Sequence, residues 1–179
     1  MVSENISFID YSNSIKIVLV GTTHPGNIGA AARAIKTMGL INLDLVCPKE
    51  FPSNEATYRS KAAKDILEKA SVYETLLESV SDCEVVIGTS ARNRKVPWPV
   101  LNPKNASIEI NKAVKNSSKV AIVFGREDRG LTNEELGLCN LHVHIPTAEE
   151  YSSLNLAQAV QIITYEIRMS FMGKENLEN

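Results

Sequence analysis

The sequence SSLNLAQAV occupies residues 152–160, where a polar loop leads directly into the longest series of apolar residues at helical spacing in the chain. Apolar residues at intervals of three and four predict one buried face of a helix. The residues on this face are Leu156, Val160, Ile163 and Ile167. Further apolar residues on other faces are Ile162, Tyr165 and Met169. We therefore expect this helix to be covered both by its own domain and by a partner subunit.

The loop before this helix carries two hydroxyl groups, at Ser152 and Ser153. The first amides of a helix have no partner within it, and a serine hydroxyl can accept a hydrogen bond from one of them. We expect these serines to cap the helix, which leaves other amides free to hold a ligand. The sequence thus places the active site at this junction of loop and helix.

Upstream of this junction, runs of β-branched residues alternate with helical patterns. The expected strands are 15–20, 43–47, a very short one at 72–73, 83–87, 120–124 and 141–145. The expected helices are 28–38 with Asn27 as its cap, an interrupted one at 54–70, 74–81, 103–114 and a short one opened by a capping box of Thr132 and Glu135. This alternation predicts an α/β protein with a mostly parallel sheet and helices on both faces.

Length and composition favour a single domain. The chain has 179 residues, of which 44% are hydrophobic and 22% charged, as is ordinary for a globular protein. We place this domain at residues 15–172, between an irregular N-terminal segment, 1–14, and a charged tail, 173–179. The formal net charge of −2 excludes a bulk polycation, so any contact with RNA must be local.

Neither a metal centre nor a membrane segment is expected. Three cysteines without CxxC spacing, and three histidines that do not pair with them at zinc-site intervals, are typical of reduced core cysteines. The N-terminus lacks a signal sequence, and no apolar run approaches the length of a membrane span. We therefore expect a cytoplasmic protein.

Four polar loops that contain glycine or follow a strand are candidates for the ligand site: 21–27, 88–99, 125–131 and 146–154. In open parallel sheets such loops converge beyond the carboxyl ends of the strands. Two of them contain GxxxxG without the following Lys and Ser/Thr, and GxGxxG is absent, which argues against a phosphate loop and a nicotinamide site. The loop 88–99 also carries three cations and the only tryptophan, so it is the expected RNA contact. Its cations are Arg92, Arg94 and Lys95.

Each candidate site residue also has a structural interpretation. Asn27, Ser153 and Thr132 can simply cap helices, which for any one of them alone is the better reading. Glu127 stands between Arg126 and Arg129 and can form a surface ion-pair cluster. Arg33 can be a solvated side chain on an alanine-rich helix. Only the joint occurrence of these residues points to function.

That combination resembles the three motifs of the SPOUT class of RNA 2′-O-ribose methyltransferases, SpoU type. It consists of Asn27 and Arg33, then Gly125-x-Glu127-x-x-Gly130-Leu131, then Ser153-Leu154-Asn155. The stretches THPGNIGAAARA, GTSAR, PWP, VFGRE and EYSSLNLAQAV are most similar, within that class, to tRNA methyltransferases that modify the ribose of nucleotide 32 in the anticodon loop. The resemblance covers residues 15 to about 171.

The resemblance implies a C-terminal trefoil knot, a homodimer, a tRNA substrate and S-adenosyl-L-methionine as cofactor. It assigns catalysis to Arg33, Asn27, Glu127, Ser153 and Asn155. It assigns cofactor binding to Thr89, Ser90, Ala91, Gly125, Arg126, Gly130, Ile145, Ser153 and Leu154. The sequence departs from the family at Ala62-Ala63, where Gly-Ala is usual, and stops at Asn179, where relatives continue into a C-terminal extension that helps to hold tRNA. We therefore expect this chain to bind tRNA weakly.

The residue types suit methyl transfer to a ribose hydroxyl, which needs alignment and proton relief but no metal. Arg33 is a poor general base because a guanidinium stays protonated, and a good clamp for phosphate. The family's usual account makes this arginine the base, so both roles remain open. The alternative to an enzyme is a non-catalytic knotted module that binds RNA. The intact set of Arg33, Glu127, Ser153 and Asn155 favours the enzyme.

Overall fold

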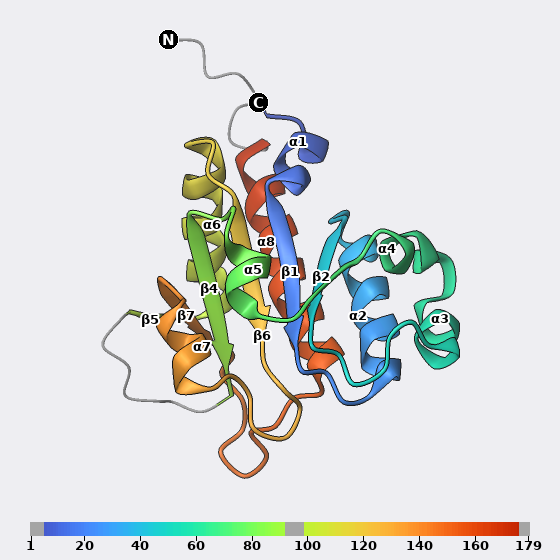
Figure 1. Ribbon diagram of the computed structural model, residues 1–179. Coiled ribbons are helices and arrows are strands. Elements are labelled where there is room, and N and C mark those ends of the chain that lie inside the picture. The colour runs from blue at the N-terminus through green and yellow to red at the C-terminus, as the bar shows by residue number, and fades with distance from the viewer. Residues whose placement is uncertain (1–5, 92–98, 176–179) are drawn as a thin grey trace.

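The computed structural model describes residues 6–91 and 99–175. In this part of the chain seven strands form one sheet in the order β3-β2-β1-β6-β4-β7-β5, and every pairing is parallel (Figure 1). The strands are β1 (Ile15–Val20), β2 (Asn42–Val46), β3 (Ser71–Tyr73), β4 (Val85–Ser90), β5 (Val100–Leu101), β6 (Val120–Phe124) and β7 (Leu141–His144). The predicted α/β class with a parallel sheet is confirmed.

Helices cover both faces of the sheet, as predicted. They are α1 (Phe8–Asn13), α2 (Pro25–Thr37), α3 (Asn54–Ser60), the 3-10 turn η1 (Lys61–Ala63), α4 (Lys64–Glu68), α5 (Leu76–Val80), α6 (Pro103–Lys115), α7 (Asn133–Gly137) and α8 (Leu156–Glu175). One apolar cluster joins the sheet to α2, α6 and α8, and a second joins its other face to α5 and α7 (Figure 1).

The strand β1 shows why the sheet needs cover on both sides. Ile17 and Leu19 lie in the first apolar cluster, whereas Val18 and Val20 lie in the second, and all four are buried. A strand buried on both faces reads as a continuous apolar run, as IKIVLV nearly does. The predicted stripe of α8 is likewise buried, with exposed fractions of 6% or less at Leu156, Val160, Ile163 and Ile167.

The N-terminal segment is not irregular, and that prediction was wrong. It contains α1, where the hydroxyl of Ser7 accepts a hydrogen bond from the Asp10 amide. The rings of Phe8 and Tyr11 lie 5.0 and 4.8 Å from that of Phe171 on α8, measured between centroids. A six-residue helix is too short to be stable alone, so its stability comes from this contact with a distant segment.

The caps predicted for two helices were also wrong. The helix α2 begins at Pro25 after His24, whose side chain makes no cap, so Asn27 lies inside the first turn. Proline suits this position because its missing N–H would have no partner there. The helix α8 begins at Leu156, and its cap is Asn155, whose Oδ1 accepts from the Ala157 amide at 2.9 Å. The predicted caps Ser152 and Ser153 lie in the loop before it.

The structure shifts some predicted strands. The strand expected at 83–87 is β4, which runs to Ser90, so Thr89 and Ser90 lie at its carboxyl end and not in a free loop. The short strand β5 was not predicted. The two-residue β5 carries too little pattern to be recognised, and it exists because it pairs with β7.

Candidate active site

The loops that follow β1 and β6 meet at the point in the sheet where the order of strands reverses. From β1 the chain continues to β2 on one side, while β6 lies on the other side of β1 and continues the sheet towards β4. Such a switch point is where open parallel sheets hold their ligands, because the loops there leave in opposite directions. Four of the predicted site residues come from segments at this end of the sheet, namely Asn27, Glu127, Ser153 and Asn155.

The carboxylate of Glu127 bridges the two loops. It accepts hydrogen bonds from the Thr23 amide and hydroxyl, both at 3.0 Å, and from the His24 amide at 3.2 Å. It also accepts one from Nδ2 of Asn27 at 3.0 Å. These amides stand at the start of α2, where helix amides lack partners and favour negative charge. The side chain therefore ties the loop after β6 to the first turn of α2.

A second link joins α2 to α8. Nδ2 of Asn155 donates to Oδ1 of Asn27 at 3.0 Å. Because Asn155 also caps α8, the chain Glu127–Asn27–Asn155 connects three segments, and Asn27 lies 100 residues from Glu127 and 128 from Asn155 in sequence. We call these three residues the motif network. Asn27 is therefore not a simple helix cap, because its side chain links α2 to two other segments of the chain.

The pKa of Glu127 lies below its ordinary value. Partial burial disfavours the carboxylate, but the hydrogen bonds from Asn27, Thr23 and His24 together outweigh that effect. The group is therefore ionised at neutral pH. The ion-pair cluster with Arg126 and Arg129 that the sequence allowed is not what the structure contains, because Arg126 binds Glu135 and Arg129 lies near Asp128.

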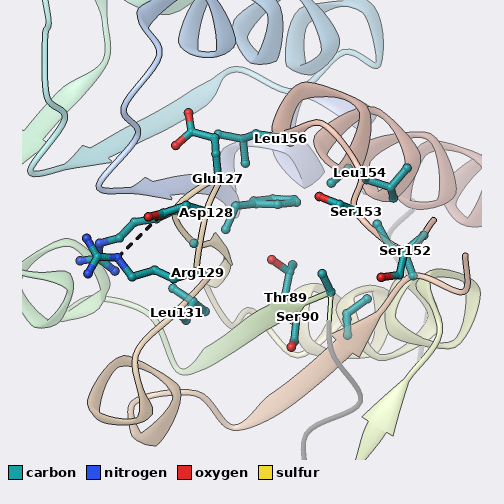
Figure 2. Close-up of a pocket in the computed structure, with 18 of the residues that line it drawn as sticks. Thr89, Ser90, Glu127, Asp128, Arg129, Leu131, Ser152, Ser153, Leu154 and Leu156 are labelled. Carbon is teal, nitrogen blue, oxygen red and sulfur yellow. Dashed lines mark ion pairs between the residues drawn. The ribbon is translucent and has the colours of Figure 1, made fainter. Parts of the chain in front are cut away.

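Beside the motif network lies a cavity of about 380 Å³, which is within the range of small-molecule sites. Ser152, Ser153 and Leu154 lie on one side of it, and Asp128 and Arg129 on the other (Figure 2). All of the residues predicted to bind the cofactor line this cavity. They are Thr89, Ser90, Ala91, Gly125, Arg126, Gly130, Ile145, Ser153 and Leu154.

The GxxxxG sequence at 125–130 forms a tight loop on the wall of the cavity. Arg126 and Gly130 exchange backbone hydrogen bonds at 3.2 and 2.8 Å, and Gly130 has a φ of +71°. A Cβ on Gly125 would lie 2.2 Å from the carbonyl carbon of Gly130, so only glycine fits there. The loop is thus closed on itself and presents Glu127 near its tip, unlike a phosphate loop.

Arg126 lines the cavity with its guanidinium already engaged. Its two terminal nitrogens each donate to Glu135 at 3.0 Å, and this pairing raises the pKa of Arg126. Its stem lies against Gly21, where a Cβ would approach Nε to 2.7 Å. Glu135 belongs to the predicted capping box with Thr132, which is confirmed. Arg126 therefore offers a ligand its backbone and stem.

Arg33 stands apart from the rest of the predicted set. It is exposed on α2, about two turns beyond Asn27, and is not among the residues that line the cavity. The structure thus brings together Asn27, Glu127 and Asn155 and places Ser153 at the cavity, but leaves Arg33 outside it. The predicted RNA contacts Arg92, Arg94 and Lys95 lie outside the described residues.

Sequence reasoning missed several residues of the cavity wall. They are Phe124, Leu136, Val143, Leu156 and Ala159. All five are apolar, and all except Ala159 are also buried in the core. Among the described residues no three His, Cys, Asp or Glu side chains are grouped so that they could hold a metal ion. Nor does the described part of the chain contain a helix long and apolar enough to cross a membrane.

The parallel sheet, with a cavity at the carboxyl ends of its strands beside the motif network, defines an α/β protein whose cavity has the size and the position of a small-molecule site. Residues 14–165 match the SpoU rRNA Methylase family, and the chain belongs to that family. The resemblance seen in the sequence is thereby confirmed.

A curated relative in Pseudomonas aeruginosa (strain UCBPP-PA14) is named tRNA (cytidine/uridine/adenosine-2'-O-)-methyltransferase TrmJ. It is 53% identical over 161 residues, which make up 90% of this chain. The chain spans 63% of the length of that relative.

Two solved structures are similar throughout this fold. A probable methylase family protein from Haemophilus influenzae Rd KW20 has a TM-score of 0.85 and 48% identity, with coverage of 91% of this chain and 68% of that one. TrmJ from Z. mobilis ZM4 has a TM-score of 0.82 and 37% identity, with coverage of 87% of this chain and 69% of that one.

Proposed function

We propose that this chain transfers the methyl group of S-adenosyl-L-methionine to a ribose 2′-hydroxyl of tRNA. The observation that carries the proposal is the motif network beside a cavity lined by every residue expected to bind the cofactor. Family membership and a relative named as a tRNA 2'-O-methyltransferase support it.

The cavity has the chemistry that such a cofactor needs. Apolar side chains, among them Leu131, Val143 and Ile145, offer a surface for a flat base, while the hydroxyls of Thr89 and Ser153 are polar partners. The cofactor supplies a methyl group on a positively charged sulfur. The residues of this chain hold and orient it, and exclude water from the reacting centre.

Within the motif network we assign Glu127 a positioning role. Both of its oxygens accept hydrogen bonds from the protein, and its lowered pKa keeps it ionised, so it is a poor carrier for the ribose proton. It holds the loop 125–130 against α2. Ser153 and backbone groups of the cavity wall are then left to meet the substrate.

We propose that Arg33 acts on the target nucleotide, either by binding its phosphate or as the general base. Arg33 is exposed and does not line the cavity of its own chain, which supports a homodimer in which the Arg33 of one subunit acts at the cavity of its partner. The exposed apolar face of α8 supports the same assembly, because Tyr165, Met169 and Met172 are 48%, 45% and 39% exposed at intervals of four and three.

The target that we propose is cytidine or uridine at nucleotide 32, reached with help from Arg92, Arg94 and Lys95. A cytoplasmic location follows from this substrate. We also propose that the C-terminal part of the domain, within residues 15–172, forms the trefoil knot of the SPOUT class.

The test of the proposed activity is methylation of unfractionated tRNA by the purified chain, with mass mapping of the modified nucleosides. We expect 2′-O-methylated cytidine or uridine, at the same rate with and without a chelator of divalent metals. Retained tRNA binding without any methyl transfer would instead support a non-catalytic RNA-binding module.

Arg33→Lys tests the role of the arginine. Lysine keeps the charge and helix propensity but lacks the planar fork that fixes a phosphate. We expect normal folding, unchanged cofactor binding and single-turnover methyl transfer slower by about a hundredfold or more. A folded variant with near-normal turnover would show that Arg33 is not the central catalytic residue.

A further inference from the structure

The side of α3 that faces solvent, next to the start of α2, carries an unusual group of side chains. Tyr58 is 68% exposed, and Arg59 and Lys61 are also exposed. Nζ of Lys61 lies 3.9 Å from the centre of the Tyr58 ring, within the range of a cation–π contact. We call Tyr58, Arg59 and Lys61 the α3 strip.

The α3 strip is held rigidly against the helix that bears Asn27 and Arg33. A Cβ on Gly29 would lie 2.1 Å from the carbonyl oxygen of Ala56, so glycine at this position lets the two backbones touch. Figure 1 shows α3 alongside the first half of α2. This contact places the backbone of α3 directly against the helix that carries Asn27.

Arg59 points along α2 towards its first turn. Its Cβ lies 2.9 Å from a Cβ built on Gly29, and its Cγ lies 3.7 Å from one built on Gly26. Gly26, Gly29 and Arg33 are spaced by three and four residues, so they share one face of α2. Arg59 therefore borders the same helix face as Arg33, near the positive end of the helix dipole.

Among residues 6–91 and 99–175, no carboxylate forms an ion pair with the cations of the α3 strip. Ion pairs within 4 Å join Lys16, Lys36, Lys112, Lys119, Arg126 and Arg129 to acidic side chains. In the same described part of the chain, none is found for Arg59 or Lys61. Glu55, four residues before Arg59, lies beside it: Oε1 of Glu55 is 2.7 Å, and Cγ of Arg59 3.7 Å, from a Cβ built on Gly26.

We propose that the α3 strip binds the phosphate backbone of the RNA substrate beside the target nucleotide. The inference rests on the proposed function and adds to it a contact surface outside the loop 88–99. Exposed arginine and lysine bind phosphates, and the exposed ring of Tyr58 offers a face on which an unpaired base can stack. In a chain of net charge −2, such local groups must supply the attraction.

The test compares two double variants that each remove two positive charges. Arg59→Gln with Lys61→Gln alters the strip while keeping long side chains. Lys112→Gln with Lys115→Gln alters the last turn of α6, which leads to the opposite, amino-terminal edge of the sheet, and serves as the control. Binding of unfractionated tRNA is measured over a salt series, together with steady-state methyl transfer and S-adenosylmethionine affinity.

We expect the strip variant to show a plot of log affinity against log salt that is shallower by about 1.4 to 1.8, as for two lost phosphate contacts. Its KM for tRNA should rise while kcat and cofactor affinity stay at the parent values. The control variant should keep the parent slope. Tyr58→Ala should weaken binding several-fold, and Tyr58→Phe should restore it.

A strip variant with the parent's slope and KM would overturn the inference, as would an equal loss in the control, which would mean that only total charge matters. These outcomes differ from failure of the proposed function. If the parent binds tRNA without methylating it, a slope change confined to the strip variant still supports the strip. If the parent does not bind tRNA at all, the strip has no RNA partner.

Discussion

The carboxylate of Glu127 accepts hydrogen bonds on both oxygens, which makes the side chain a fixed link between the loop 125–130 and α2. Glu127→Gln keeps the shape but replaces one oxygen with a group that donates. At least one donor among Thr23, His24 and Asn27 would then face another donor. We expect a loss of about 1–3 kcal/mol in the free energy of unfolding and reduced methyl transfer.

The matched control for this change is Glu134→Gln, which removes a carboxylate that is exposed on α7. Thermal unfolding of both variants gives the comparison, and the loss expected for Glu127→Gln corresponds to several degrees in a domain of this size. Equal melting temperatures for the two variants would show that the motif network adds nothing to stability.

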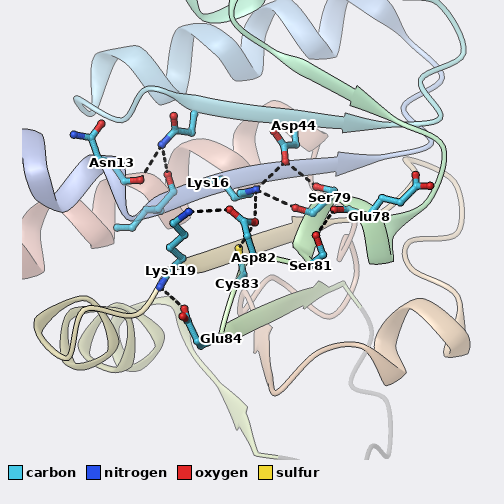
Figure 3. Close-up of polar contacts among 12 residues, drawn as sticks. Asn13, Lys16, Asp44, Glu78, Ser79, Ser81, Asp82, Cys83, Glu84 and Lys119 are labelled. Atoms are coloured by element: carbon cyan, nitrogen blue, oxygen red, sulfur yellow. Dashed lines mark hydrogen bonds and ion pairs between the residues drawn. The ribbon is translucent and has the colours of Figure 1, made fainter.

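Asp82 belongs to a polar cluster at the opposite end of the sheet, where its two oxygens meet Nζ of Lys16 at 3.0 Å and Nζ of Lys119 at 3.1 Å (Figure 3). The hydrogen bond from Lys16 is the largest of the effects that lower the pKa of Asp82 to about 2. A carboxyl group whose pKa is lower in the folded than in the unfolded chain stabilises the fold above the unfolded value of 3.8.

We therefore expect the contribution of Asp82 to be lost as the pH falls from about 4 to about 2. Its size should be modest, because the side chain is 47% exposed and solvent screens the pair. Urea unfolding across this range should show a smaller loss of stability for Asp82→Asn than for the parent. Identical pH dependence in the two proteins would contradict this account.

At the scale of elements, the sequence pattern predicts those helices and strands that depend only on residues close together in the sequence. The strands expected at 15–20 and 120–124 match β1 and β6 at both ends, because short apolar runs rich in β-branched residues strongly favour a buried strand. The helix α1 could not be predicted, since it depends on aromatic contacts with α8, more than 150 residues away. The local sequence pattern contains no information about contacts with such distant residues.

In the candidate site, too, the sequence predicted the residues but not their contacts with distant segments. Its residues could be named from their motifs, and all of those expected at the cavity line it. The wrong caps at Asn27 and Ser153 have one cause, because a cap pattern records only that a side chain can bond to nearby amides. Asn27 instead bonds to Glu127 and Asn155, which topology brings to it from elsewhere in the chain.

The exposed face of α8 is the element on which the proposed homodimer depends. Met169, 45% exposed between Tyr165 and Met172, lies in the middle of this face. Met169→Glu would bury a charge in the interface, so we expect it to sediment at the chain mass of 19.7 kDa and the parent at twice that mass. Methyl transfer should fall with it if Arg33 acts across the interface.

The control for this variant is Leu77→Glu, which places the same charge at a residue 60% exposed on α5, on the other face of the sheet. It should sediment like the parent. A parent that stays monomeric well above micromolar concentration, or a Met169→Glu protein that still dimerises, would remove the proposed role of α8.

For the whole molecule, the order of strands is what turns four separate loops into one site. That order cannot be read from sequence, because alternating strands and helices are compatible with several parallel sheets. In the observed order β1 lies between β2 and β6, and the loops that follow β1 and β6 meet through Glu127. The family match then connects this geometry to RNA methylation.

The central claim is that the methyl group goes to a ribose hydroxyl of tRNA. The most direct test uses two copies of one tRNA, identical except that the nucleotide mapped as the target carries 2′-deoxyribose in the second. We predict that the parent chain methylates the first with S-adenosylmethionine and leaves the second unmodified at that nucleotide, although it binds both. Methylation of the deoxy substrate at the same nucleotide would place the methyl group on the base and contradict the account.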